Sequence, residues 1–284
     1  MKKPYKRKVE VVVISDVHLG TRGCHAKELL QYLKSIQPKT VILNGDIIDI
    51  WQFKKSYFPK AHLKVIKLLT TWMTKGISIY YVTGNHDEML RRFVGLKMGS
   101  LKIVNKVVLK LGDKKAWFFH GDVFDVTMQH SRWLAMLGSV GYDLLIVLNR
   151  LVNGISKKMG RGKISLSKKI KNSVKSAVKF INNFEKVAAD IGIENGYDYV
   201  VCGHIHQPEI KSFGEDEKSI TYLNSGDWIE NLTALEYNKG SWSIYRHDPS
   251  HYSLEIAFKY EAETNKELFQ LMLNEFNLLR KTAE

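Results

Sequence analysis

Short apolar stretches recur along the chain, and five of them end abruptly in polar residues. These stretches are rich in β-branched or aromatic side chains and cover residues 9–15, 40–43, 77–83, 116–119 and 197–202. Between the first three, residues 26–36 and 62–75 carry apolar side chains at the spacing of an amphipathic helix. Strands that alternate with helices predict parallel strands in a buried sheet, so the pattern favours an α/β fold. Ligands of such sheets bind beyond the carboxyl ends of the strands, where the polar residues fall.

The pattern changes in the second half of the chain. Residues 125–193 have mostly helical spacing with few strand signals. Strand-like stretches return at residues 220–223, 232–237 and 241–246. The tripeptide Asn238-Lys239-Gly240 is a favourable hairpin turn, and residues 261–284 predict a closing amphipathic helix. We therefore expect one domain over residues 1–284 that carries 125–193 as a helical insertion.

The composition indicates a folded and strongly basic protein. Hydrophobic residues make up 44% and aromatic residues 11% of the 284 residues, which excludes a disordered or fibrous protein. The 43 Lys and Arg residues outnumber the 29 Asp and Glu residues, which gives a net charge of +14. Such a charge attracts nucleic acid, anionic lipid or phosphorylated substrates. Two cysteines are too few for a disulfide framework and favour a reducing compartment.

Neither an export signal nor a membrane-spanning helix is predicted. Asp16 and His18 follow the first apolar stretch too closely for it to be the core of a signal peptide. The longest apolar stretch, residues 133–152, contains Asp143 and Arg150. These charges argue against a spanning helix but allow a helix that touches a bilayer.

The five polar strand ends gather side chains that can bind metal ions. The set is Asp16, His18, Asp46, Asp49, Asn85, His86, Asp87, His120, Asp122, His204 and His206. A ligand set of carboxylates, imidazoles and one amide suits Mn²⁺, Zn²⁺ or Fe²⁺. It is poorly suited to a thiolate site or to an all-oxygen calcium site. Seven or eight ligands exceed the need of one ion, and a shared carboxylate can hold two ions about 3.5–4 Å apart. Any one of these motifs alone is more often a capped turn, but five in this order favour a dimetal site.

The order of the motifs resembles that of the calcineurin-like metallophosphoesterases. The matching motifs are Asp16-x-His18, Gly45-Asp46-x-x-Asp49, Gly84-Asn85-His86-Asp87, His120 and Gly203-His204-x-His206. The resemblance covers roughly residues 9–246 and implies a four-layer sandwich of two mixed β-sheets flanked by helices, with a helical cap insertion. It also implies one metal ion on Asp16, His18 and His206, a second on Asn85, His120 and His204, and Asp46 as their bridge.

The same resemblance implies how the site works. Two divalent cations, with Mn²⁺ as the first candidate and Zn²⁺, Fe²⁺ or Mg²⁺ as alternatives, would ionise a bridging water and neutralise the phosphate oxygens. His86 would stabilise the transition state or protonate the leaving oxygen, and Asp49 would orient its imidazole. We interpret Asp87 as a structural turn residue.

Two further features resemble the UDP-2,3-diacylglucosamine diphosphatases of lipid A synthesis. They are the segment Tyr222-Leu223-Asn224-Ser225-Gly226-Asp227-Trp228 and the insertion. This resemblance implies attack on the α-phosphorus of a UDP-glucosamine lipid, which releases UMP and the lipid monophosphate. Residues 150–186 contain eleven basic residues and one acidic residue, a net charge of +10, and follow a dense apolar stretch. Binding of a phosphorylated lipid or of an anionic membrane surface needs both apolar contacts for the acyl chains and basic residues for the phosphates.

The substrate hypothesis leaves alternatives open. It places the protein in the cytoplasm at the inner membrane, with Arg161, Lys163 and Lys168 as candidate substrate contacts. Alternatively, residues 133–152 form a helix pair that faces the core, and the lysines are its solvent-exposed face with no binding role. The positive charge also allows a nucleic-acid or cyclic-nucleotide phosphodiesterase, although residues 157–179 lack the aromatic residues of a single-strand binding surface. A non-catalytic scaffold of the same fold is a third hypothesis, which the complete ligand set argues against.

Overall fold

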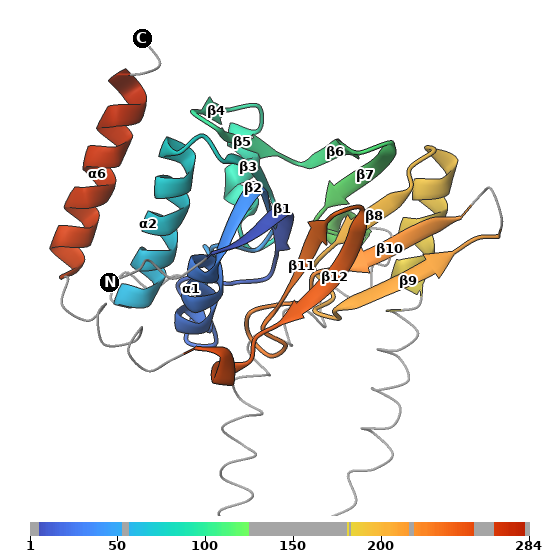
Figure 1. Ribbon diagram of the computed structural model, residues 1–284, viewed down its shortest axis with the longest axis horizontal. Coiled ribbons are helices and arrows are strands. Elements are labelled where there is room, and N and C mark those ends of the chain that lie inside the picture. Colours follow the sequence, from blue (N-terminus) through green and yellow to red (C-terminus); the bar gives the residue numbers. More distant parts are fainter. Residues whose placement is uncertain are drawn as a thin grey trace, which may run out of the picture. The chain divides into compact units, whose positions relative to one another are not determined.

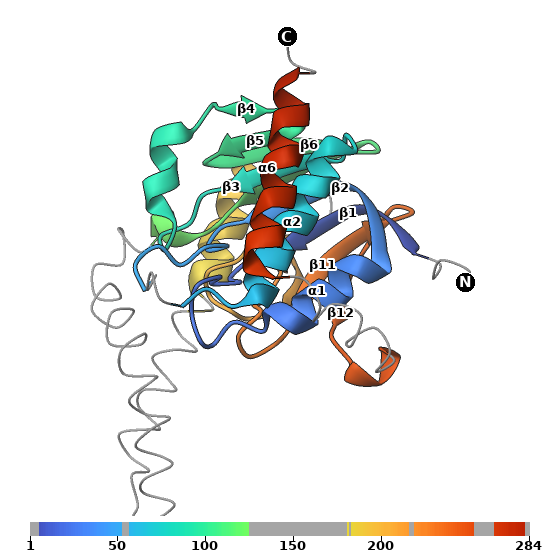
Figure 2. The same ribbon diagram turned by 90° about the vertical axis from the view of Figure 1, so that its left-hand side faces the viewer.

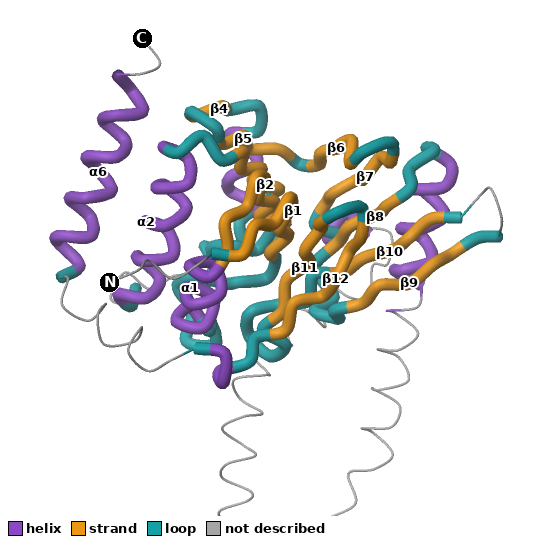
Figure 3. Tube along the Cα trace, viewed as in Figure 1, coloured by secondary structure: helices purple, strands orange, loops and turns teal. Residues whose placement is uncertain are grey.

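The fold is built on a seven-stranded sheet and a five-stranded sheet (Figures 1 and 3). The computed structural model describes residues 6–52, 57–124, 181, 183–215, 219–252 and 264–281. The first sheet has the order β12-β11-β1-β2-β3-β5-β4. Its strands are β1 Arg7–Ile14, β2 Ile36–Asn44, β3 Ser78–Val82, β4 Lys97–Met98, β5 Leu101–Val104, β11 Thr233–Asn238 and β12 Ser241–Arg246. Strands β1, β2, β3 and β5 are parallel neighbours, and the others run antiparallel to the strands they pair with.

The second sheet is also mixed and has the order β6-β7-β8-β10-β9. Its strands are β6 Lys106–Leu111, β7 Lys114–Phe119, β8 Tyr199–Cys202, β9 Glu209–Phe213 and β10 Ile220–Asn224. Strand β8 runs parallel to both β7 and β10, while β6 and β9 pair antiparallel at the two edges. The carboxyl ends of β7 and β8 therefore lie together, as do those of β1, β2 and β3.

Alternation along the strands divides the core into two layers. In β1, Val12 and Ile14 pack on the side of helices α1 and α2, whereas Val11 and Val13 face the second sheet. The second layer includes Phe118, Val201 and Leu223 from the five-stranded sheet. Both faces of β1 are thus buried, which explains why its sequence is a nearly continuous apolar stretch.

Helices form the outer layers of the sandwich. Helices α1 (Ala26–Ser35) and α2 (Lys60–Thr74) cover the first sheet, and α6 (Asn265–Lys281) packs outside α2 (Figure 2). The hydroxyl groups of Thr70 and Thr71 on α2 each donate to the Glu275 carboxylate on α6. Residues 188–194 are helical and pack on the second sheet, where Gly192 lies against Ile220. Two sheets between two helical layers match the predicted four-layer architecture. None of the helices in the described parts of the chain is long and apolar enough to cross a membrane.

The remaining described elements are short or lie in a second unit. Three 3₁₀ helices are η1 (Glu88–Phe93), η2 (Asp122–Phe124) and η4 (Pro249–His251). The chain divides into two units, of which the second spans Asp122–Val187, and among its described residues the rings of Phe124 and Phe184 lie 5.4 Å apart. Most of the predicted helical insertion, 125–193, falls outside the described residues, apart from 181 and the helical residues 183–193.

Within the described residues, the structure confirms the predicted strands and the helices predicted at 26–36, 62–75 and 261–284, and it adds four strands. Strands β4, β5, β6 and β9 were not predicted. The hairpin at Asn238-Lys239-Gly240 is present, and the positive φ angles of Lys239 (50°) and Gly240 (85°) suit a tight hairpin turn. The five polar strand ends belong to two sheets, three to the first sheet and two to the second. The two mixed sheets that the resemblance implies are therefore confirmed.

One buried histidine ties helix α2 to the loop after β1. His62 is 3% exposed, and its Nδ1 accepts a hydrogen bond of 2.9 Å from the backbone N–H of Gly20. The rings of Tyr57 and Phe58 lie beside it. Burial lowers the pKa of His62 to about 4. A neutral His62 therefore holds this loop in place at neutral pH.

Replacing His62 with asparagine is expected to flatten the acid side of the stability profile. The unfolded state binds a proton at His62 near pH 6.5, but the folded state does so only near pH 4. The free energy of unfolding of the wild type therefore falls as pH drops through this window, and His62→Asn should lose roughly 1 kcal/mol less between pH 7 and pH 5. Urea unfolding at both pH values measures this. The exposed His251→Asn is the control, and equal losses in wild type and His62→Asn would contradict the prediction.

Candidate metal centre

The candidate ligands follow the carboxyl ends of five strands. Asp16 and His18 lie after β1, Asp46 after β2, Asn85 after β3, His120 after β7, and His204 and His206 after β8. The two sheets pack face to face through a shared apolar layer, with both sets of strand ends on the same side. Residues far apart in sequence therefore meet: the backbone N–H of His204 donates to Asp16 Oδ2 at 3.0 Å.

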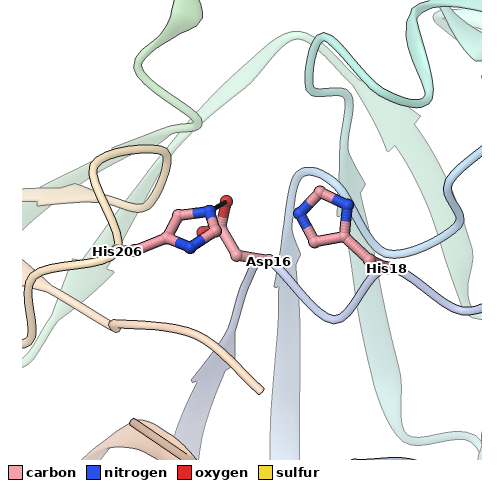
Figure 4. A group of neighbouring side chains, drawn as sticks. All are labelled: Asp16, His18 and His206. Atoms are coloured by element: carbon pink, nitrogen blue, oxygen red, sulfur yellow. Dashed lines mark ion pairs between the residues drawn. The ribbon is translucent and has the colours of Figure 1, made fainter. Parts of the chain in front are cut away.

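These side chains form overlapping groups whose potential ligand atoms lie within 4.8 Å of one another. One group is Asp16, His18 and His206, and another is Asp46, His120 and His204. In the first, His206 Nε2 lies 3.2 Å from Asp16 Oδ1 (Figure 4). In the second, His120 Nε2 lies 3.1 Å from Asp46 Oδ2. Asp46 also belongs to a third group with His18 and His86, so this carboxylate is common to both halves of the site.

Several ligand atoms are buried without a hydrogen-bond partner among the described residues. They are His18 Nε2, Asn85 Oδ1 and Asp16 Oδ1, of which the last is close to His206. A buried polar atom without a partner costs free energy, so these atoms fit a site that binds cations. Asn85 would contribute its amide oxygen, and the unpartnered Oδ1 fits that role.

The carboxylates of the centre carry charge at neutral pH. Burial alone would raise the pKa of Asp16, but His206 and His120 outweigh it and lower the pKa to about 2. For Asp46, His120 and its neighbouring imidazoles likewise overcome burial and hold the pKa below its usual range. Although burial opposes it, the pairing with Asp16 raises the pKa of His206 to about 9, so a cation that binds there must displace a proton.

Residues 9–208 match the family model of the calcineurin-like phosphoesterases. The chain belongs to the calcineurin-like phosphoesterase family. This membership supports a hydrolase of phosphoesters with a dimetal centre, for which the groups above supply the candidate ligands.

Relatives of this phosphoesterase carry two different activities in their names. The UDP-2,3-diacylglucosamine hydrolase of Blochmanniella pennsylvanica is 26% identical over 248 residues, which cover 81% of this chain and 93% of that protein. The DNA double-strand break repair protein Mre11 of Methanococcus maripaludis is 24% identical over 290 residues, which cover 97% of this chain and 73% of that protein. The structure of the phosphoesterase Yfce from E. coli aligns with 84% of this chain and 99% of its own, at 13% identity and a TM-score of 0.40.

Asp49 of this phosphoesterase holds two imidazoles at once. Its Oδ2 accepts from Nδ1 of His18 at 3.1 Å and from Nδ1 of His86 at 3.0 Å, while Oδ1 accepts from the backbone N–H of Gln52. Burial opposes its charge, but the two imidazoles bring the pKa of Asp49 well below its usual range. With Nδ1 engaged, each ring keeps Nε2 for a metal ion or a substrate. The contact with His86 was expected, and the contact with His18 was not.

Replacing Asp49 with asparagine is expected to lower metal affinity and turnover together by roughly 10- to 100-fold. The amide oxygen can still accept one hydrogen bond, but it loses the charge that fixes the tautomers of His18 and His86. Titration with Mn²⁺ and hydrolysis of bis(p-nitrophenyl) phosphate measure the two effects. Asp113→Asn, at an exposed turn, is the control. Unchanged affinity and rate would show that Asp49 orients neither ring.

Five of the candidate ligands have a backbone conformation that side chains rarely adopt. The φ angles are 52° for Asp16, 52° for His18, 55° for Asp46, 68° for His204 and 53° for His206. Each such residue costs free energy, and concentrated strain of this kind is typical of functional sites. The local sequence carries no signal for it.

Asp87 and Asp122 lie outside the ligand groups. Asp87 Oδ1 accepts from the N–H of Gly84, and Oδ2 accepts from the N–H of Ile47 and the hydroxyl of Tyr81. It is fully buried and ties the loops after β2 and β3 together, as its interpretation as a structural residue anticipated. Burial and the charge of Asp46 raise the pKa of Asp87. Asp122 belongs to none of the ligand groups among the described residues.

The segment after β10 makes hydrogen bonds to the two loops that carry Asp16 and His206. The sequence alone did not predict these contacts. Asp227 is buried and accepts three backbone N–H bonds, from Ile229, Glu230 and Asn231. The Asn231 side chain bridges the Asp227 carboxylate to the carbonyl of His206. The N–H of Trp228 donates to the carbonyl of Asp16 at 3.1 Å. One segment therefore fixes the loops that carry Asp16 and His206.

One aromatic residue at the centre also escaped prediction. Trp51 is 50% exposed, and its ring lies 5.2 Å from that of His86. The candidate substrate contacts Arg161, Lys163 and Lys168 lie outside the described residues.

Proposed function

We propose that this phosphoesterase hydrolyses UDP-2,3-diacylglucosamine to the lipid monophosphate and UMP. The observation that carries the proposal is the Asp46 carboxylate shared by groups of ligands drawn from both sheets. A shared carboxylate between two sets of ligands is typical of two-metal phosphoryl hydrolysis. The relatives named as UDP-2,3-diacylglucosamine hydrolases favour this substrate within the reaction class.

In this proposal the ligands divide as the family resemblance implies. Asp16, His18 and His206 would hold one ion, and Asn85, His120 and His204 would hold the other, with Asp46 as the ligand they share. These residues would bind two divalent cations, with Mn²⁺ as the first candidate, and the chemistry supplied by such ions would be an ionised water at neutral pH and neutralisation of the phosphate oxygens. The protein contributes no nucleophile of its own. Its buried, ionised carboxylates supply the negative charge that retains the cations.

His86 and Asp49 serve the leaving group. A ring nitrogen of His86 lies within 4.8 Å of ligand atoms of His18 and Asp46, so the imidazole borders the reaction centre without belonging to either metal triad. Nδ1 donates to Asp49, which leaves Nε2–H of the protonated ring to donate to the leaving oxygen. Asp49 stabilises this protonated form by its charge.

The cellular setting follows from the substrate. A diacylated nucleotide sugar resides in a membrane, so we propose that the protein works in the cytoplasm, peripheral to the inner membrane. The strongly basic composition suits an anionic membrane and a pyrophosphate substrate. The basic insertion remains the candidate for both contacts.

A nucleic-acid phosphodiesterase is the second candidate. It is favoured by the match to Mre11, which covers 97% of this chain, and by the net charge of +14. A protein that tracks phosphates would bind oligonucleotides with a steep dependence on salt.

Turnover of defined substrates separates the candidates. The Mn²⁺-loaded protein is assayed with UDP-2,3-diacylglucosamine in detergent, with bis(p-nitrophenyl) phosphate and with single-stranded and duplex DNA. We expect kcat/KM on the lipid to exceed the others by orders of magnitude, with UMP as the product. Equal turnover of lipid and soluble diester would overturn the lipid assignment, and faster cleavage of DNA would favour the nuclease. A protein that binds no Mn²⁺ and cleaves none of them would be a scaffold.

A further inference from the structure

A strongly exposed apolar and basic loop follows the candidate catalytic histidine. Residues 89–97 read Met-Leu-Arg-Arg-Phe-Val-Gly-Leu-Lys and contain three basic residues and no acidic residue. Met89, Phe93 and Leu96 are each 48% exposed and Val94 is 41% exposed. Every residue from 91 to 97 is exposed. We propose that this 89–97 loop docks the protein on an anionic lipid bilayer.

Backbone hydrogen bonds fix the conformation of the loop, and they therefore also fix the positions of its exposed apolar side chains. The N–H of Leu90 donates to the carbonyl of Asp87 at 2.9 Å, and Leu90 packs against the core beneath the sheet. The N–H of Gly95 donates to Ile103 on β5 at 2.9 Å, and the N–H of Ile103 donates back to Leu96 at 3.1 Å. In Figure 2 the helical turn η1 of this loop stands at the left-hand margin, next to β4.

The charge and shape of the loop match a bilayer surface. Arg91, Arg92 and Lys97 flank the apolar residues 93–96 and would contact lipid phosphates, while Phe93 and Leu96 would enter the boundary between headgroups and acyl chains. Each basic residue near an anionic leaflet contributes about 1 kcal/mol. Nucleic acid fits less well, because Phe93 is the only aromatic ring among the four exposed apolar side chains, and Met89, Val94 and Leu96 offer bases no stacking face.

The position of the loop gives docking a purpose. Phe93 is seven residues after His86, so the chain allows at most about 25 Å between the docked surface and the reaction centre. A protein held by this loop presents its centre to substrates at the surface of the bilayer. This purpose, though not the docking itself, rests on the proposed function.

Vesicle binding by the full-length protein tests the docking. Wild type, Phe93→Ser/Leu96→Ser and Arg91→Gln/Arg92→Gln are co-sedimented with phosphatidylcholine vesicles that contain about 30% phosphatidylglycerol. Each double variant should lower the partition coefficient about tenfold or more, and the wild type should bind pure phosphatidylcholine far more weakly. The apolar control is Phe269→Ser/Leu273→Ser on α6, whose side chains are 56% and 39% exposed. The charge control is Lys106→Gln/Lys110→Gln on β6, where both lysines are exposed.

The outcomes separate docking from catalysis. Loss of binding in the loop variants alone, with unchanged hydrolysis of bis(p-nitrophenyl) phosphate, supports the proposal whatever the natural substrate proves to be. Wild-type binding that survives both loop variants, or falls equally in the controls, overturns it. A wild-type dimer that Phe93→Ser/Leu96→Ser dissociates also overturns it, because the loop would then join two copies of the chain. Failure of the lipid substrate assay alone affects only the proposed function.

Discussion

Replacing Asp46 with asparagine is expected to reduce phosphodiester hydrolysis by roughly 10³-fold and to abolish binding of at least one metal ion. The Asp46 carboxylate is the only side chain common to the groups that contain His18 and His120 among the described residues. Asparagine has the same shape, but it removes the negative charge and replaces one oxygen by an N–H donor. Oδ1 accepts from the N–H of His86, so the amide nitrogen would take the place of Oδ2, which lies 3.1 Å from His120 Nε2. A 10³-fold lower rate corresponds to a loss of about 4 kcal/mol of transition-state stabilisation.

Two measurements and one matched control make the Asp46 test specific. Calorimetric titration with Mn²⁺ counts the ions bound by wild type and variant, and hydrolysis of bis(p-nitrophenyl) phosphate at saturating Mn²⁺ gives kcat. Asp122→Asn changes a carboxylate that also follows a strand end but belongs to none of the ligand groups in the described chain. It should bind and turn over within about twofold of wild type. An Asp46→Asn protein with two ions and near-normal kcat would mean that no ion depends on the shared carboxylate.

The sequence was sufficient for the candidate ligands because their signal is local. A strand that is buried on both faces reads as an apolar stretch, so its last residue is visible where the polar residues begin, as at Asp16 and Asp46. Whether the side chain at that position can bind a metal ion then follows directly from the residue type. The edges of the sheets were less readable, because β6 is half-exposed and β4 has only two residues.

The supporting contacts could not be predicted because they join distant parts of the chain. The bridge from Asp227 through Asn231 to His206 depends on how the loop after β10 meets the loop after β8. The Arg7 guanidinium pairs with Glu236, which is 229 residues away. The positive φ angles of the ligands are likewise imposed by the surrounding fold. No local pattern of residue types encodes any of these features.

Replacing Gly84 with alanine is expected to damage the centre through a single methyl group. A Cβ at this position would collide with Asp46 Oδ1 and would lie 2.7 Å from the Asp46 backbone nitrogen and 2.9 Å from Cγ. The backbone of Gly84 does not itself need glycine, because its φ is not in the left-handed region. The clash therefore acts on the carboxylate. We expect Mn²⁺ affinity and kcat/KM to fall by about 100-fold, as when a ligand is displaced from its place.

Gly23→Ala provides the matched control, because a Cβ there would meet only Ile229 at an ordinary distance of 3.5 Å. It should leave metal binding and turnover unchanged. Urea unfolding of both variants without metal separates damage to the site from loss of the fold. If Gly84→Ala remains folded but binds Mn²⁺ weakly, the space beside Gly84 sets the position of Asp46. If it binds and turns over like wild type, the Asp46 carboxylate can move without consequence, and the shared-carboxylate arrangement on which the proposed function depends is wrong.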